Sequence, residues 1–281
     1  MKTVLICHEE AVFDRDGLAR WMGSFSELAG IVVLRETRER KRKRVRKELE
    51  RVGLWRFADV LAFRAYYRAR LAAPDAAWER AVLADLARRF APLSPDVQVL
   101  TTTSPNTPEA QAFLTALVPD LMIARCKTLL AERIFSIPTV GTFVLHPGIC
   151  PEYRNAHGCF WALANDDVRK VGVTLLRIDK GIDTGPTFGY FSYAYDEVAE
   201  SHIVIQQRCV TENLDAIRDR LRAVAEGRAI PLDTRGRPSG EWGQPWLTRY
   251  VRWKSQARAR ARGNAVRSLT PDIMRPVEDR A

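Results

Sequence analysis

The stretch GTFVLHPGICPEYRNAHG, residues 141–158, is the most informative part of this sequence. It begins with an apolar run of strand length, residues 142–145. The run ends at His146, and the proline and glycine residues that follow predict a rigid loop. In open α/β sheets, ligands bind just beyond the carboxyl ends of the strands. We therefore expect His146 to lie at a ligand site.

A second stretch, VGVTLLRIDKGIDTGP at residues 171–186, pairs a strand with an acidic loop. Residues 171–178 are strand-like, and Asp183 lies between two glycines in the turn-rich segment after them. If the two strands are neighbours, His146 and Asp183 meet at one rim of the sheet. A carboxylate beside an imidazole orients it and favours its charged form. Such a pair can polarise a carbonyl and manage the proton that an attacking amine loses.

Both stretches resemble the catalytic domain of the formyltetrahydrofolate-dependent transferases. That family includes the glycinamide ribonucleotide, methionyl-tRNA and sugar N-formyltransferases. The resemblance extends over residues 95–226, and residues 120–127 are similar to the strand and loop that surround the folate pterin. The matching motifs, in order, are His146-Pro147, the loop with Pro151, Tyr153 and Arg154, Val171–Thr174 and Asp183–Pro186.

The resemblance implies roles for particular residues. His146 would hold the formyl oxygen, and Asp183 would raise the basicity of His146 and help to remove the amine proton. The co-substrate would be 10-formyltetrahydrofolate, which carries the activated carbon, so no metal is implied. The residues expected to bind it are Ala124, Arg125, Cys126, Lys127, Ile178, Asp179 and Gly181.

One position departs from the family pattern. The family usually has an asparagine two residues before the histidine, as an oxyanion donor, and this chain has Val144. Loss of one such donor costs about 3 kcal/mol of transition-state stabilisation. Arg154, Asn155 and His157 are the candidates for an oxyanion or acceptor contact in its place.

The rest of the chain predicts an α/β fold with an open, mainly parallel sheet and helices on both faces. Further strands are expected at residues 3–7, 29–34, 97–100, 121–124 and 188–195, separated by helical segments. One long helix is expected over residues 202–226. The first turn lacks GxGxxG, which argues against a conventional dinucleotide site. The fold implied by the resemblance is Rossmann-like, and we expect the catalytic domain to span residues 1–227.

Two basic segments account for much of the net charge of +10. Residues 35–90 predict a helical insertion, first basic and then amphipathic. It is either a solvated helix packed by its later half or a surface for anionic partners such as nucleic acid, nucleotide-linked sugar or membrane phosphate. Residues 228–281 form an extension rich in arginine and tryptophan, in which 252–262 predict a basic helix or a disordered tail.

Composition limits the class of protein. A chain of 281 residues with 46% hydrophobic residues can bury a substantial core. Its five cysteines are scattered and form no CxxC, so neither a zinc site nor a disulfide framework is predicted. No run approaches the length of a membrane helix. A cytoplasmic protein, with oligomer formation left open, is the expectation.

The resulting functional hypothesis is an enzyme that transfers a formyl group from 10-formyltetrahydrofolate to an amine. A small metabolite or an amino sugar nucleotide is favoured as acceptor, and nucleic acid is left open. Methionyl-tRNA is less favoured, because its enzyme has a further C-terminal β-barrel and residues 228–281 are too short and too basic to form one. The alternatives are a hydrolase of the formyl donor and a catalytically weak folate- or anion-binding protein of the same fold.

Overall fold

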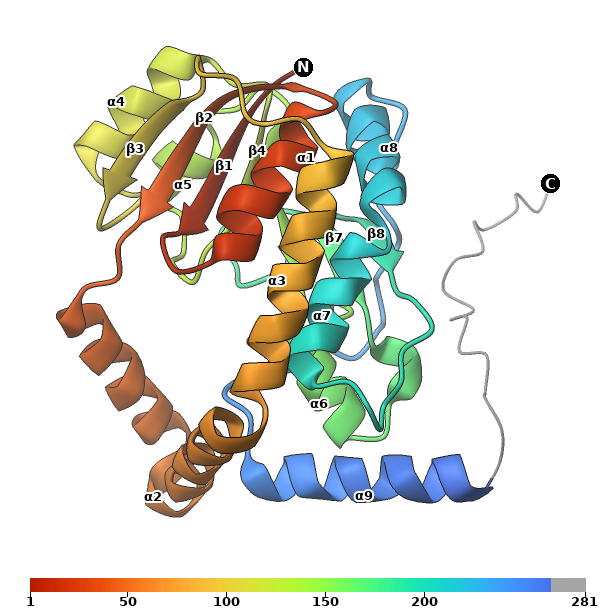
Figure 1. Ribbon diagram of the computed structural model, residues 1–281. Coiled ribbons are helices and arrows are strands. Elements are labelled where there is room, and N and C mark those ends of the chain that lie inside the picture. The colour runs from red at the N-terminus through yellow and green to blue at the C-terminus, as the bar shows by residue number, and fades with distance from the viewer. Residues whose placement is uncertain (264–281) are drawn as a thin grey trace.

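The computed structural model describes residues 1–263, and a seven-stranded sheet forms their centre (Figure 1). The strand order is β3-β2-β1-β4-β5-β7-β8. The strands are β1 Lys2–His8, β2 Glu27–Leu34, β3 Gln98–Thr102, β4 Leu121–Arg125, β5 Gly141–His146, β7 Val173–Arg177 and β8 Thr187–Phe191. Each of the predicted strands is present, with bounds that differ by a few residues.

The sheet is mainly parallel, as predicted. The pairs β3–β2, β2–β1, β1–β4 and β4–β5 are parallel, whereas β5–β7 and β7–β8 are antiparallel. Thr174 therefore lies beside His146, and Arg177, at the end of β7, lies beside Phe143. The expectation that two neighbouring strands end at one rim is wrong for this pair. Asp183 reaches the rim of His146 only through the connection between β7 and β8.

Helices cover both faces of the sheet, again as predicted, and bury two apolar clusters. One cluster includes Trp21, Leu86 and Phe143, beneath η1 Phe13–Leu18, α1 Ala19–Gly23, α3 Ala72–Arg89, α6 Gly158–Ala164, α7 His202–Thr211 and α8 Leu214–Ala225. The other includes Val32, beneath α4 Pro108–Leu117 and α5 Glu132–Phe135. Burying one such large side chain contributes about 1.5–3 kcal/mol.

The predicted insertion at residues 35–90 consists of two helices with different surroundings. Helix α2 spans Arg38–Arg70. Thr37 caps its N-terminus, because the Thr37 hydroxyl accepts from the Arg40 N–H. It bends at Gly53, where φ of 75° suits glycine. We call residues 38–52 the first arm and 54–70 the second arm. The first arm stands away from the sheet in Figure 1, whereas α3 packs against η1, α1 and α7.

The predicted single helix over residues 202–226 is two helices, α7 and α8. Asn213 separates them with φ of −119°, outside the helical range. Its side-chain amide donates to the carbonyls of Ser192 and Cys209, each at 2.9 Å. These bonds offer the backbone an alternative to helix continuation.

The segment after Gly227 returns to the domain. Strand β9, Glu241–Trp242, pairs with β6, Arg154–Asn155, and α9, Leu247–Gly263, contacts α2 and α6. Residues 252–262, predicted as a basic helix or a tail, are helical, and the remainder of the predicted extension, 264–281, lies outside the described residues. No helix within residues 1–263 combines the length and the apolar character needed to cross a membrane.

Candidate active site

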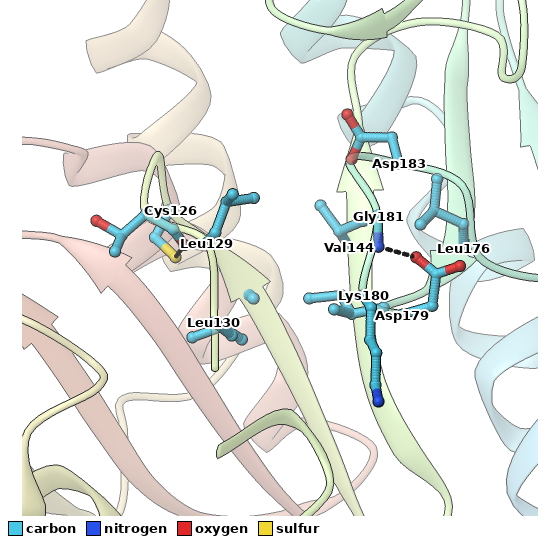
Figure 2. A pocket seen from close by; sticks show the side chains of 12 residues that line it. Cys126, Leu129, Leu130, Val144, Leu176, Asp179, Lys180, Gly181 and Asp183 are labelled. Carbon is cyan, nitrogen blue, oxygen red and sulfur yellow. Dashed lines mark hydrogen bonds between the residues drawn. The ribbon is translucent and has the colours of Figure 1, made fainter. Parts of the chain in front are cut away.

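A pocket lies between the ends of β4 and β5 and the connection after β7. Figure 2 shows Cys126, Leu129 and Leu130 on one side, and Val144 with Asp179, Lys180, Gly181 and Asp183 on the other. The pocket contains about 580 Å³ of space, including the part open to solvent. The residues that line it are Ala124, Cys126, Thr128, Leu129, Leu130, Val144, Leu176, Ile178, Asp179, Lys180, Gly181 and Asp183.

Five of the seven residues predicted to bind the co-substrate line this pocket: Ala124, Cys126, Ile178, Asp179 and Gly181. The other two are Arg125 and Lys127, whose side chains are turned to other partners. The Arg125 guanidinium donates to Asp14 at 2.9 Å and to the Leu145 carbonyl at 2.5 Å. The Lys127 ammonium lies 3.8 Å from Glu10.

His146 is almost fully buried, with 3% of its surface exposed, and both ring nitrogens have partners. Nε2 lies 2.7 Å from the Tyr153 carbonyl, and Nδ1 lies 3.2 Å from Asp183 Oδ2. A carbonyl and an ionised carboxylate can only accept hydrogen bonds. Both contacts are satisfied when each nitrogen carries a proton. The geometry therefore suits an imidazolium–carboxylate pair.

Three hydrogen bonds fix the connection between β7 and β8 around Asp183. The Asn155 N–H donates to its Oδ2 at 2.8 Å. The Arg154 guanidinium donates to the carbonyl of Ile182 at 2.7 Å, one residue away. On the other side, Asp179 accepts from the Gly181 N–H at 2.9 Å, the bond drawn in Figure 2. These contacts return the chain from the far end of β7 to His146.

Two glycines allow the loop after β5 to pack tightly around His146. A Cβ on Gly158 would lie 2.6 Å from the Cα of Gly148 and 2.7 Å from the Tyr153 carbonyl. A Cβ on Gly148 would lie 2.5 Å from the same carbonyl. Thr174 of β7 ties this loop to the sheet, because its hydroxyl donates to the Gly148 carbonyl at 2.5 Å. The Tyr153 carbonyl, which lies beside His146 Nε2, is thus fixed by close backbone contacts.

The three candidates for a substitute donor lie beside the pocket but are not among its lining residues. The Asn155 amide donates to the Trp242 carbonyl at 2.7 Å, and Arg154 donates to Ser239 as well as to Ile182. Burial lowers the pKa of His157 to about 4, helped by the charges of Lys127 and Arg64, so its imidazole is neutral. Val144 lines the pocket and offers no donor.

The structure adds residues that the sequence did not single out. His8, at the end of β1, accepts from the Lys127 N–H at 3.0 Å and so supports the loop after β4. Burial, followed by the charge of Lys127, lowers the pKa of His8. Its place at the carboxyl end of a strand was the signal that could have revealed it.

The C-terminal segment also supports the site. Arg237 donates to both carboxylate oxygens of Glu152, at 3.0 and 2.7 Å, and Trp242 donates to the Glu152 carbonyl at 2.9 Å. Trp242 stacks on Tyr153, whose carbonyl accepts from His146, with ring centroids 5.6 Å apart. The bidentate pair of Arg237 and Glu152 is charged on both sides, so it is among the stronger hydrogen-bonded contacts. No pattern in the sequence predicted that residues 237–242 contact the loop after β5.

One basic side chain of α2 contacts the lining of the pocket. Arg40 donates to Thr128, which lines the pocket, at 3.5 Å. Burial lowers the pKa of Arg44, and the charge of Arg64 acts in the same direction. Burial also lowers the pKa of Lys127, again with a contribution from Arg44. The charge of α2 therefore acts on the loop after β4, which contains Lys127 and Thr128.

Within residues 1–263, no group of three or more histidine, cysteine, aspartate or glutamate side chains is arranged to hold a metal ion. Cys150 lies in the loop after β5, and burial raises the pKa of its thiol, with a further contribution from Asp183. A thiol held neutral in this way is a poor nucleophile. At the edge of the pocket, Asp183 of the lining contacts His146 behind it.

Comparison with known proteins identifies relatives of the region around this pocket. The formyl transferase family model matches residues 73–192, from the start of α3 to just beyond β8. The methionyl-tRNA formyltransferase of Caldanaerobacter subterraneus subsp. tengcongensis is 29% identical over 170 residues, 59% of this chain and 53% of that protein. That of Pseudomonas syringae pv. tomato is 37% identical over 95 residues, 34% of this chain and 30% of that protein. The chain thus spans about half the length of the first relative and less of the second.

Two solved structures share the fold. The phosphoribosylglycinamide formyltransferase of Anaplasma phagocytophilum has a TM-score of 0.51 and 10% identity, covering 87% of this chain and 99% of that one. The 4-N formyltransferase of Francisella tularensis has a TM-score of 0.52 and 9% identity, covering 91% and 87%. At such identities the likeness concerns the fold alone. Helix α2 and the segment from α7 onward lie outside the residues that the family model matches.

Proposed function

We propose that this chain, which belongs to the formyl transferase family, transfers a formyl group from 10-formyltetrahydrofolate to an amine. The observation that carries the proposal is the contact between His146 and Asp183 at the edge of the pocket, 3.2 Å apart. Transfer requires a group that takes a proton from the attacking amine and a positive charge near the developing oxyanion. The two side chains supply both.

The lining of the pocket supports this choice of co-substrate. Leu130, Val144 and Ile178 give it apolar walls, and Thr128, Asp179 and Asp183 bring polar side chains to it. Ligand pockets commonly combine apolar walls with a few polar groups. A flat heteroaromatic ring such as pterin suits this combination. When bound, the co-substrate supplies an activated formyl carbon.

Each member of the pair has its own part in the reaction. Asp183 lines the pocket, so its carboxylate is the group placed to accept the proton that the amine loses. His146 lies behind it and orients its carboxylate through the contact between Nδ1 and Oδ2. An imidazolium at His146 would also stabilise negative charge that develops on the formyl oxygen. Asn155 and Arg154 act by orienting the loop of Asp183 through the bonds described above.

For the acceptor, we propose a small amine that carries phosphate, such as an amino sugar nucleotide. The support is the bond from Arg40 to Thr128 of the pocket lining, with Lys127 one residue away and the charge of Arg44 acting on Lys127. Arginine forks bind phosphate oxygens in pairs, and a low-dielectric rim strengthens the attraction. Glu36 and Glu10 pair with Arg44 and Lys127, so an incoming phosphate would exchange with these carboxylates.

One observation favours a second candidate, a folate-binding protein with little turnover. Val144 lines the pocket where an oxyanion donor is usual in the family, and its side chain cannot donate. The absence of one such donor costs about 3 kcal/mol, or more than a hundredfold in rate. Turnover and binding must therefore be measured separately.

The test is release of tetrahydrofolate from 10-formyltetrahydrofolate, followed by absorbance with and without a panel of amines. Each amine is supplied with and without phosphate, and His146→Ala is the inactive reference. We expect release that depends on one phosphate-bearing amine. Release without any amine would reject the transferase in favour of a hydrolase. Tight binding of the co-substrate with no release in any condition would support the binding protein.

A further inference from the structure

The loop after β4 connects the wall of the pocket to the end of β1. The residues of this loop that line the pocket, three of which are labelled in Figure 2, are Cys126, Thr128, Leu129 and Leu130. Lys127 lies between them, and its backbone N–H donates to Nε2 of His8 at 3.0 Å. His8 is only 5% exposed and ends β1, which lies between β2 and β4 in the sheet. A buried, anchored side chain therefore holds the middle of a loop that lines the pocket.

The bond to His8 has a special place among the contacts of this loop. Asn106 binds the end of the loop, since it accepts from the Ala131 N–H at 2.8 Å and donates to the Leu129 carbonyl at 2.9 Å. Within residues 1–263, His8 is the only side chain that accepts from a backbone N–H of residues 126–130. The part of the loop nearest β1 therefore depends on His8 for its position.

The bond from Lys127 requires a neutral His8. A backbone N–H can only donate, so Nε2 must be free of a proton, and the proton of the neutral ring is on Nδ1. A proton on Nε2 would set two N–H groups against each other and leave the Lys127 N–H without its acceptor. The bond is therefore compatible with only one charge state of the imidazole.

The groups that face His8 come from several elements and together favour its neutral form. Burial lowers the pKa of His8, and the charge of Lys127 is the next cause. Glu10 raises the pKa, Arg44 of α2 lowers it, and the Leu34 carbonyl of β2 raises it. Glu10 is also engaged by the Lys127 ammonium, at 3.8 Å. His8 is thus neutral near pH 7 and gains its proton only below the usual histidine value of about 6.5.

We propose that His8 is a positioning residue for the co-substrate, and that its protonation breaks the bond to Lys127, loosens the loop after β4 and lowers the affinity of the pocket. The inference rests on the proposed function, because it takes the pocket to be the site of the folate co-substrate. Two observations carry it: the bond from Lys127 to Nε2, and the pocket lining on both sides of Lys127. A neutral His8 orders the loop before the ligand arrives, and preorganisation of this kind raises affinity.

The first test measures how binding depends on pH. The probe is 5-formyltetrahydrofolate, which keeps its formyl group at both pH values, and fluorescence titration gives its Kd at about pH 7.5 and about pH 5.5. From the higher to the lower pH, the Kd of the native chain should rise on the order of threefold more than that of His8→Gln. The reason is that only the neutral fraction of His8 presents the ordered loop. The comparison between the two proteins cancels the titration of the probe and of other groups.

The choice of variants separates charge from packing. His8→Gln offers an oxygen that can accept from the Lys127 N–H and does not titrate, so its affinity at about pH 7.5 should match the native chain. His8→Leu offers no acceptor and should bind about two- to tenfold more weakly at both pH values. His202→Phe removes a buried histidine from α7 and should keep the native pH dependence. Circular dichroism checks that each variant folds, and His8→Gln decides if His8→Leu does not.

A second measurement needs no ligand. Hydrogen–deuterium exchange, followed by mass spectrometry of the peptide that contains residues 126–130, reports on the opening of the loop. Each variant is compared with the native chain at the same pH, which removes the intrinsic pH dependence of exchange. Native protein should exchange faster than His8→Gln at about pH 5.5 and at the same rate at about pH 7.5.

The outcomes distinguish this inference from the proposed function. Equal pH dependence of binding in the native chain and in His8→Gln would overturn the inference, and so would equal exchange at the lower pH. Faster exchange without a change in affinity would overturn the link between the loop and the co-substrate. If the native chain bound no probe at either pH, the proposed function would fail, and the exchange measurement would still decide whether protonation of His8 loosens the loop.

Discussion

Replacing Asp183 with asparagine removes the proposed proton acceptor while keeping the shape of the site. Asparagine retains an oxygen at the position that accepts from the Asn155 N–H at 2.8 Å, so the loop should keep its path. The charge beside His146 Nδ1, now 3.2 Å away, is lost. His146 then lacks its anionic partner, and the amine loses the pocket carboxylate that lies beside His146.

The expected loss follows from the role. A positioned general base contributes about 10²–10⁴ in rate, which is about 3–5.5 kcal/mol of transition-state stabilisation. We expect kcat to fall by that factor with little change in the affinity for the co-substrate. The assay is tetrahydrofolate release at saturating amine, together with the equilibrium binding of the co-substrate.

Asp179→Asn is the matched control. Asp179 also lines the pocket, in the same connection, and accepts from the Gly181 N–H and the Thr184 hydroxyl. Its replacement keeps an acceptor oxygen and removes a charge that does not contact His146. If Asp183→Asn retained kcat within a few-fold, or if the Asp179 variant lost as much, the role given to Asp183 would be refuted.

Three further predictions concern the oxyanion donor, the loop and acid stability. Val144→Asn should raise kcat by up to about 10²–10³, since it adds a donor to the pocket wall; an unchanged rate would show that another group already serves. Gly158→Ala should cost at least about 1–3 kcal/mol of unfolding free energy in urea, because its Cβ meets backbone at 2.6 Å, and unchanged stability would disprove the tight packing. Burial lowers the pKa of His157 to about 4 and that of His202 well below its usual value. Below about pH 6.5 the unfolded chain therefore binds more protons than the folded chain, and the free energy of unfolding falls on acidification. His202→Phe should make that fall shallower in urea unfolding at about pH 7 and pH 5, and an equally steep fall would contradict the assignment.

The sequence was sufficient for the strands and for the position of His146. Apolar runs of strand length mark β1, β4 and β5, and the glycine- and proline-rich loop marks the carboxyl end of β5. These signals are local, because they depend on which residues can be buried or can turn. The mainly parallel order of the sheet followed from their alternation with helical segments.

The features that sequence reasoning missed depend on contacts between distant segments. The reversal of β7 is set by its pairing with β5 and β8, so no local signal revealed that Asp183 returns through a loop. The break between α7 and α8 depends on bonds from Asn213 to Ser192 and Cys209. The pairing of β9 with β6 joins residues almost 90 positions apart.

The arrangement of the candidate site was predicted from the sequence in part. His146 and Asp183 were expected to lie together and do so, and five of the seven residues expected to hold the co-substrate line one pocket. The surroundings of Asn155 were beyond reach, because its amide binds the Trp242 carbonyl of a segment with no motif. The bend of α2 at Gly53 was equally hidden, because the apolar spacing continues on both sides of it.

The most direct test of the central claim follows the formyl carbon itself. The protein is incubated with 10-formyltetrahydrofolate labelled with ¹³C in the formyl group and with the amine selected by the panel, and the products are examined by mass spectrometry and NMR. The account predicts labelled formamide on the amine, formed by the native chain and absent with His146→Ala. Label recovered only as formate, or amine products that persist when His146 is replaced, would contradict it.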